Sequence, residues 1–131
     1  MRLALSLHAP TDELRSELMP VNDRYPVSAL VHECTRYFEL RHRKVFVEYV
    51  LLRGVNDRYE QARALVELLD PRVFKVNLIP YNPTGMFEGS SRKATAAFRR
   101  ALQEHGLPAT VRLTRGRDIA AACGQLAAAR A

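Results

Sequence analysis

The sequence has few of the residues on which small cross-linked or metal-bound domains depend. Its 131 residues include two cysteines, Cys34 and Cys123, which do not make a disulfide framework. No Cys or His spacing fits a zinc site, and a glycine-rich phosphate loop is missing. A pair of neighbouring carboxylates suited to glycoside hydrolysis is also missing. With so few cysteines, a reducing cytoplasm is the simplest setting.

Long hydrophobic runs are absent as well. No apolar stretch approaches the ~20 residues that a membrane span requires. The first eight residues are too short and too soon interrupted to form a secretory signal. The apolar fraction of 47% and the charged fraction of 26% are typical of a soluble globular protein. We therefore expect one domain over residues 1–131, with no membrane partner.

Positive charge is in excess. The net charge is +6 and the sequence pI is about 9.8, which favours a polyanionic partner, with nucleic acid ahead of phosphorylated substrates. Each cluster alone would be ordinary solvated surface, and the summed bias is the stronger signal. The clusters are Arg41, Arg43 and Lys44; Arg92, Lys93, Arg99 and Arg100; and Arg112, Arg115 and Arg117.

Strand and helix patterns alternate along the chain. Strands are predicted over residues 2–8, 44–52, 73–79 and 109–113, the middle two buried on both faces. Helices are predicted to be capped by Thr11, to begin near Pro26, to be capped by Asn56, and to be capped by Ser90 or Ser91. Alternation of this kind predicts an α/β fold with a parallel sheet and right-handed crossovers. Four strands make a sheet with two open edges and no closed barrel, so we expect the second half of a larger protein.

In such a fold the loops that follow strands form the functional face. Those loops are residues 6–10, 52–56, 81–90 and 114–123. His8 ends the first strand, and period two would place Ser6 on the same face. Asn82 offers a donor and an acceptor at a strand exit, although turn chemistry alone would also explain it.

Two further residues carry an open alternative. Glu48 is the one carboxylate in an otherwise apolar strand, so it either faces a polar pocket or meets an arginine. Cys123 follows a basic loop with Arg115 and Arg117, among alanines too small to hide a thiol. Nearby cations favour the nucleophilic thiolate. On spacing alone, packing of Cys123 as a small hydrophobe on a final helix is favoured over chemistry, as Cys34 is expected to pack in the core.

Several longer motifs resemble one family. They are residues 3–10 (LALSLHAP) with 19–22 (MPVN), 48–52 (EYVLL) with 54–57 (GVND), 76–83 (VNLIPYNP), and 114–116 (TRG) with 118–126 (DIAAACGQL). Together and in this order they are similar to the dual-specificity RNA methyltransferases, radical-SAM enzymes of the RlmN and Cfr type. The resemblance covers nearly the whole chain.

The resemblance implies a partial radical-SAM (β/α) barrel, S-adenosylmethionine and a [4Fe–4S] cluster as cofactors, and methylation of adenine C2 in 23S ribosomal RNA or transfer RNA. It assigns the methyl-accepting cysteine to Cys123. It assigns S-adenosylmethionine contacts to Ser6, Leu7, His8 and Asn82. In that family the S-methylated cysteine supplies the methylene group that attacks the base.

The departures from the family pattern are equally specific. The Cys-x₃-Cys-x₂-Cys cluster motif, the second catalytic cysteine and the general-base glutamate are absent. We therefore expect the C-terminal half of such an enzyme, inactive alone and dependent on a missing N-terminal half. The alternatives are a non-catalytic basic RNA-binding or regulatory module, and an unrelated thiol enzyme in which His8 would serve Cys123.

Overall fold

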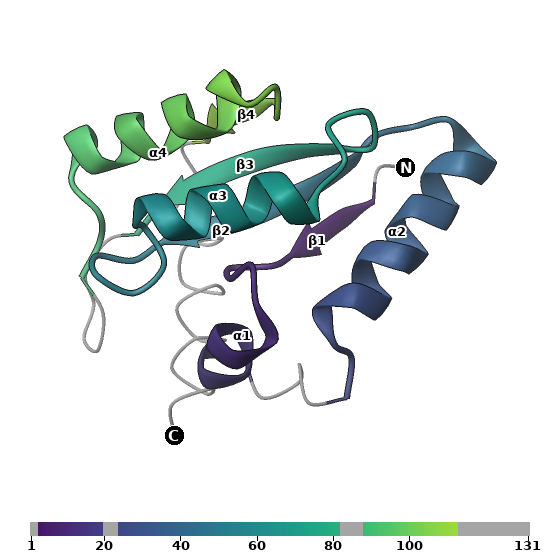
Figure 1. Cartoon of the computed structure of the whole chain (residues 1–131), viewed down its shortest axis with the longest axis horizontal. Coiled ribbons are helices and arrows are strands. Elements are labelled where there is room, and N and C mark those ends of the chain that lie inside the picture. The colour runs from purple at the N-terminus through teal and green to yellow at the C-terminus, as the bar shows by residue number, and fades with distance from the viewer. Residues whose placement is uncertain (1–2, 20–23, 82–87, 113–131) are drawn as a thin grey trace.

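The computed structural model describes residues 3–19, 24–81 and 88–112, and its four strands form one open parallel sheet in the order β1-β2-β3-β4 (Figure 1). The strands alternate with helices, as predicted. The elements are β1 (Ala4–Ser6), α1 (Asp12–Leu18), α2 (Val27–Arg41), β2 (Val45–Leu51), α3 (Tyr59–Leu68), β3 (Phe74–Pro80), α4 (Arg92–Glu104) and β4 (Ala109–Val111). The predicted α/β class and parallel sheet are confirmed. β1, β2 and β4 are shorter than the apolar runs that predicted them, whereas β3 has the predicted length and begins one residue later.

One face of the sheet is buried beneath α2, α3 and α4. Alternate residues of β2 point into this core and are fully buried, including Val47 and Tyr49. The Tyr49 ring stacks on Phe98 of α4, with ring centroids 5.4 Å apart. Cys34 of α2 is buried in the same cluster, and burial raises the pKa of its thiol. The prediction that Cys34 is a core residue is confirmed.

The opposite face differs from the prediction. Both central strands were expected to be buried on both faces, but Phe46, Glu48, Lys75 and Asn77 are only half-buried. Among the described residues, apolar packing on this face is confined to the carboxyl end of the strands. There α1 and its neighbours form a second cluster: Ala9, Leu14, Leu18, Met19, Val50, Leu52, Val55, Ile79 and Tyr81.

Helix caps follow the sequence at two of the predicted positions. The hydroxyls of Thr11 and Ser91 accept hydrogen bonds from the amides of Leu14 and Ala94, at 3.3 and 3.0 Å. These bonds satisfy amides that the first turn would leave unpaired. The predicted Asn56 cap is wrong, because the N-cap is Arg58, two residues later, and α3 begins at Tyr59.

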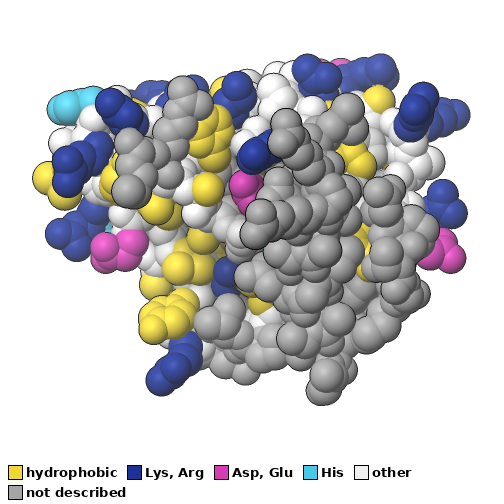
Figure 2. All heavy atoms as spheres, turned by 180° about the vertical axis from the view of Figure 1, so that it is seen from behind, with side chains coloured by type: hydrophobic (Ala, Val, Ile, Leu, Met, Phe, Trp, Pro, Cys, Tyr) yellow, Lys and Arg dark blue, Asp and Glu magenta, His cyan; other side chains and the backbone are white. Residues whose placement is uncertain are grey.

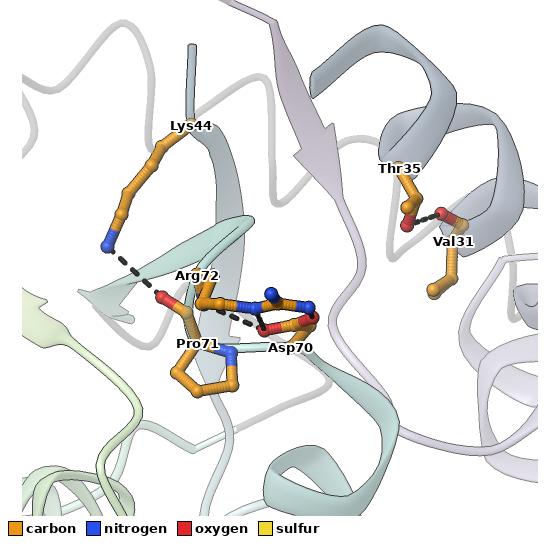
Figure 3. A network of polar contacts seen from close by, with 6 residues as sticks. All are labelled: Val31, Thr35, Lys44, Asp70, Pro71 and Arg72. Carbon is orange, nitrogen blue, oxygen red and sulfur yellow. Dashed lines mark hydrogen bonds and ion pairs between the residues drawn. The ribbon is translucent and has the colours of Figure 1, made fainter. Parts of the chain in front are cut away.

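The amino ends of the central strands are held by a turn with ordinary surface chemistry. Asp70 accepts hydrogen bonds from the amide and guanidinium of Arg72, and Lys44 donates to the carbonyl of Pro71 at 3.1 Å (Figure 3). In parallel α/β folds this end of the strands serves stability and the other end serves function. The carboxyl ends are therefore where a site is expected.

Candidate functional site

The loops that leave the first three strands are joined to one another. The amide of Arg53 donates to the carbonyl of Glu88 at 2.7 Å, and the Ser90 hydroxyl donates to Asp57 Oδ2 at 2.6 Å. Gly89 lies so close to the Tyr81 carbonyl that an added Cβ would sit 2.0 Å from its oxygen. Only glycine fits there, and Gly89 also forms an isolated antiparallel bridge with Leu52, so the loops after β2 and β3 are held in contact. The predicted gathering of strand exits is confirmed for these loops, and residues 114–123 lie outside the described residues.

Asn56 ties the exit of β1 to the exit of β2. Its side chain is fully buried, its Oδ1 accepts from the Leu52 amide at 2.8 Å, and its Nδ2 donates to the carbonyls of His8 and Val50 at 2.8 and 2.7 Å. All the capacity of the NH₂ group is therefore used within the fold. Asn56 has a bridging role here, and its three bonds explain why it does not cap α3.

His8 is held neutral at the end of β1. Its side chain is 2% exposed, and its Nδ1 accepts a hydrogen bond from the Val50 amide at 3.0 Å. The ring proton must therefore be on Nε2. Burial, and secondarily the charge of Arg15, lowers the pKa of His8 from 6.5 to about 4. Among the described residues, Nε2–H has no hydrogen-bond partner, which leaves a neutral, buried donor at the strand exit.

The strand from which a shared face for Ser6 and His8 was predicted ends before His8. β1 ends at Ser6, and His8 adopts a left-handed backbone conformation with φ of 60°. The alternation of side chains that holds within a strand stops at this point. His8 therefore turns toward β2 and binds Val50, while Ser6 remains in register with the sheet.

Arg15 of α1 covers the carbonyls at this exit, and sequence reasoning missed it. Its side chain is 4% exposed, its Nε donates to the Leu7 carbonyl at 3.1 Å, and its Nη2 donates to the Ser6 carbonyl at 3.1 Å. Burial lowers the pKa of Arg15. A buried guanidinium needs such acceptors because its desolvation is costly. The available signal was a single arginine between Leu14 and Leu18 on a short helix that follows a strand exit.

We define the strand-exit cluster as His8, Arg15 and Asn56. Below it, on the half-buried face, a polar row crosses all four strands in register. Ser6 pairs with Glu48, Glu48 with Asn77, and Asn77 with Thr110. Thr110 Oγ1 donates to Asn77 Oδ1 at 2.9 Å. We define this polar row as Ser6, Glu48, Asn77 and Thr110.

The structure answers the question left open for Glu48. Its Oε1 lies 3.3 Å from Nη1 of Arg112, just beyond β4. It also lines a cavity of about 380 Å³, together with Ala4, Phe46, Asn77 and Arg112. Both alternatives for Glu48 therefore hold, a polar cavity and an arginine partner. A polar row beside a cavity can orient a polar ligand by hydrogen bonds.

The remaining predicted site residues, Asn82 and Cys123, lie outside the described residues. Within the described ranges, no group of three or more His, Cys, Asp or Glu side chains is placed to hold a metal ion. The full sequence contains two cysteines, of which Cys34 is buried in α2. This chain cannot supply three thiolates for a [4Fe–4S] cluster, so the residues present do not fit that group. No described helix is long and apolar enough to cross a membrane.

The fold resembles a solved enzyme structure over most of the chain. A crystal structure of a radical SAM methyltransferase from Sphaerobacter thermophilus matches with a TM-score of 0.86 and 49% sequence identity, covering 95% of this chain and 37% of that one. The open parallel sheet and its helices are therefore a portion of a radical SAM methyltransferase fold. No family model matches the chain.

Sequence relatives define the family more narrowly. The chain is 55% identical over 131 residues to a probable dual-specificity RNA methyltransferase RlmN from Frankia alni, and 52% identical over 128 residues to one from Moorella thermoacetica. Each match covers 96% of this chain, but only 30% and 36% of those proteins. The chain is similar to RlmN methyltransferases over nearly its whole length and spans about a third of the length of these relatives. The predicted family resemblance is confirmed.

Proposed function

We propose that this chain is the C-terminal portion of an RlmN-type methyltransferase that modifies adenine C2 in ribosomal or transfer RNA in the cytoplasm. In this proposal the chain carries the methyl-accepting Cys123 and part of the S-adenosylmethionine pocket. The main support is the 55% identity to an RlmN relative over nearly the whole chain. The polar strand exits of the described sheet add physical support, because ligands of parallel α/β folds bind at that edge.

The strand-exit cluster is suited to one side of that pocket. His8 is neutral, and its Nε2–H has no partner among the described residues, so it can donate to a ligand without placing a second cation beside a sulfonium. Arg15 already occupies the carbonyls of Ser6 and Leu7, so in this arrangement those carbonyls support the pocket wall. Bound S-adenosylmethionine would supply the methyl group that Cys123 accepts. Asn82 completes the proposed set of contacts.

The iron–sulfur cluster of the family cannot be bound by the residues of this chain. With two cysteines in the sequence, one of them buried, it lacks the ligands of a [4Fe–4S] cluster. We therefore propose that the chain is inactive alone and that the cluster is held by the remaining length that the relatives possess. Its own residues would bind cofactor at the strand exits and present Cys123.

The test is complementation. The chain is produced together with the remaining, cluster-bearing segment of the Moorella thermoacetica relative, reconstituted anaerobically, and assayed for methyl transfer to RNA. Activity is expected from the pair and from neither part alone. Cys123→Ala should abolish it, whereas Cys34→Ala, the matched cysteine control, should retain it. Full activity of the Cys123→Ala pair would refute the proposal.

A non-catalytic RNA-binding module is the second candidate, and the net charge of +6 favours it. It predicts RNA binding whose affinity falls steeply with rising salt. Under this alternative Cys123→Ala leaves every measurable function of the chain unchanged. The complementation assay separates the two, because only the methyltransferase proposal requires the Cys123 thiol.

A further inference from the structure

A groove runs along α4 on the side that faces the edge strand β4. It has a volume of about 610 Å³ and is lined mainly by α4. The lining residues are Pro80, Ser90, Arg92, Thr95, Ala96, Arg99, Arg100, Gln103 and Val111. Pro80 ends β3 and Ser90 belongs to the loop that follows it, so one end of the groove opens at the strand exits. The other end follows α4 away from them.

The groove carries positive charge without a built-in counterion. Three arginines line it, Arg92, Arg99 and Arg100, and within the described parts of the chain no carboxylate pairs with any of them. The first turn of α4 contains no acidic residue, and Lys93 adds a further cation there. Cations at a helix N-terminus face the positive end of the helix dipole. An anionic partner would relieve both repulsions.

Part of this surface is fixed in advance. Arg99 Nε and Gln103 Nε2 both donate to the Ala109 carbonyl, at 3.2 and 2.9 Å. The two bonds hold the Arg99 side chain against β4 and leave its terminal nitrogens available to a ligand. Restricting a long side chain before binding lowers the entropy that binding must overcome.

The shape of the groove favours a polymer over a small anion. From Arg92 to Gln103 the helix rises about 17 Å. Charges spread over that length match a chain of phosphates better than one phosphate group. Lys and Arg side chains also outweigh acidic ones at the upper right of Figure 2, which corresponds to the upper left of Figure 1, where α4 runs.

We propose that the α4 groove binds the phosphate backbone of the RNA substrate on its way from the strand exits. The identification of the polymer as RNA rests on the proposed function, whereas the position and charge of the groove do not. An RNA whose target base lies at the strand exits must leave over a neighbouring surface. The α4 groove opens at that edge and carries the required charge.

The test measures the affinity of the full chain for a fluorescein-labelled single-stranded RNA by anisotropy at several salt concentrations. Ala96→Glu puts a carboxylate into the groove, and Ala97→Glu puts one on the same exposed helix outside the groove lining. Ala96→Glu should weaken binding about fivefold or more, and Ala97→Glu less than about twofold. Equal effects of the two variants would overturn the proposal.

A second variant set removes the cations. Replacing Arg92, Arg99 and Arg100 together by Gln should lower the affinity about tenfold or more and reduce the salt slope by about 2, since each contact to single strands contributes ~0.7. The control replaces Arg36, Arg41 and Arg63, which are exposed on α2 and α3, and changes the net charge equally. A control that loses as much affinity as the groove variant would show that only net charge matters, and would also overturn the proposal.

Failure of the α4 groove and failure of the proposed function give different results. Ala96→Glu in the complemented enzyme should still allow methylation of Cys123, because RNA takes no part in that step. If Ala96→Glu and the triple variant leave RNA affinity unchanged while Cys123→Ala abolishes activity, the groove proposal is wrong and the function stands. If the groove variants lose RNA affinity while Cys123→Ala remains active, the reverse holds.

Discussion

The two faces of the sheet differ in the side chains that they carry: one is apolar and buried, and the other includes half-buried polar residues. On the helix-covered face, Val47, Tyr49 and their neighbours are fully buried among apolar side chains. On the opposite face, Glu48 and Asn77 stand in register and border a cavity. The difference is consistent with packing on one face and with the proposed contact with a polar ligand on the other.

The largest expected effect on stability comes from truncating a side chain on the helix-covered face, compared with truncating one on the opposite face. Leu65→Ala in α3 removes a fully buried side chain from the helix-covered face and should lower the free energy of unfolding by about 4 kcal/mol. Phe46→Ala, on the half-buried opposite face, should cost about 1 kcal/mol. Urea denaturation followed by circular dichroism gives both values. Equal losses would contradict the asymmetry.

Next in size is the bridge at the strand exits. Asn56→Ala leaves the Leu52 amide and two carbonyls unpaired in a buried site and should cost about 3 kcal/mol. Asn77→Ala, the matched amide on the polar row, loses one hydrogen bond in a half-buried setting and should cost about 1 kcal/mol. The same denaturation curves compare them. If Asn77→Ala lowers the free energy of unfolding as much as Asn56→Ala, the prediction that Asn56 is the more important structural residue is wrong.

The pH dependence of stability tests the neutral state of His8. Its pKa is lowered from 6.5 to about 4 by burial, so the unfolded chain binds more protons between these values. The His8 contribution is fully present above 6.5 and is lost as pH falls toward 4. Between about pH 8 and pH 5 the loss should be about 2 kcal/mol.

His8→Asn provides the matched control for that prediction. Asparagine tolerates the left-handed backbone, and its Oδ1 can accept from the Val50 amide as Nδ1 does. The variant should fold and should lack the His8 share of the pH dependence. If wild type and His8→Asn lose stability in parallel as the pH falls, His8 is not the titrating group.

The smallest effect is expected at the charged pair beside the polar row. Glu48→Gln removes the partner of Arg112, whose side chain is 51% exposed while that of Glu48 is 29% exposed. An ion pair of this exposure contributes less than about 1 kcal/mol, and salt should reduce it further. A thermal-melting series in low and high salt measures the change. A decrease in the free energy of unfolding above about 2 kcal/mol would show that the Glu48–Arg112 pair contributes more to stability than an exposed ion pair does.

The sequence was sufficient for the elements and insufficient for the contacts between them. Period-two and helical patterns predicted all four strands and the caps at Thr11 and Ser91, because those signals are local. The Asn56–His8 bond joins residues 48 apart, and the Glu48–Arg112 pair joins residues 64 apart. Such contacts depend on strand register, which no local pattern in this chain specifies.

The site residues also separate into those that local sequence signals predict and those that depend on long-range contacts. Ser6, His8 and Glu48 could be selected from the sequence because each interrupts an apolar run. Asn77 and Thr110 can be recognised as site residues only once the strand register aligns them with Glu48. Arg15 can be recognised only once α1 is seen to pack against the exit of β1. The roles of Asn82 and Cys123 come from the family resemblance and stay predictions.

The central claim is that Cys123 accepts a methyl group at the strand exits of this sheet, and peptide mass spectrometry tests it most directly. The chain is isolated from cells that also produce the cluster-bearing segment of the relative, then digested and analysed. The peptide containing Cys123 should carry one added methyl group, and the peptide containing Cys34 none. An unmodified Cys123 in a complex that methylates RNA would contradict the account.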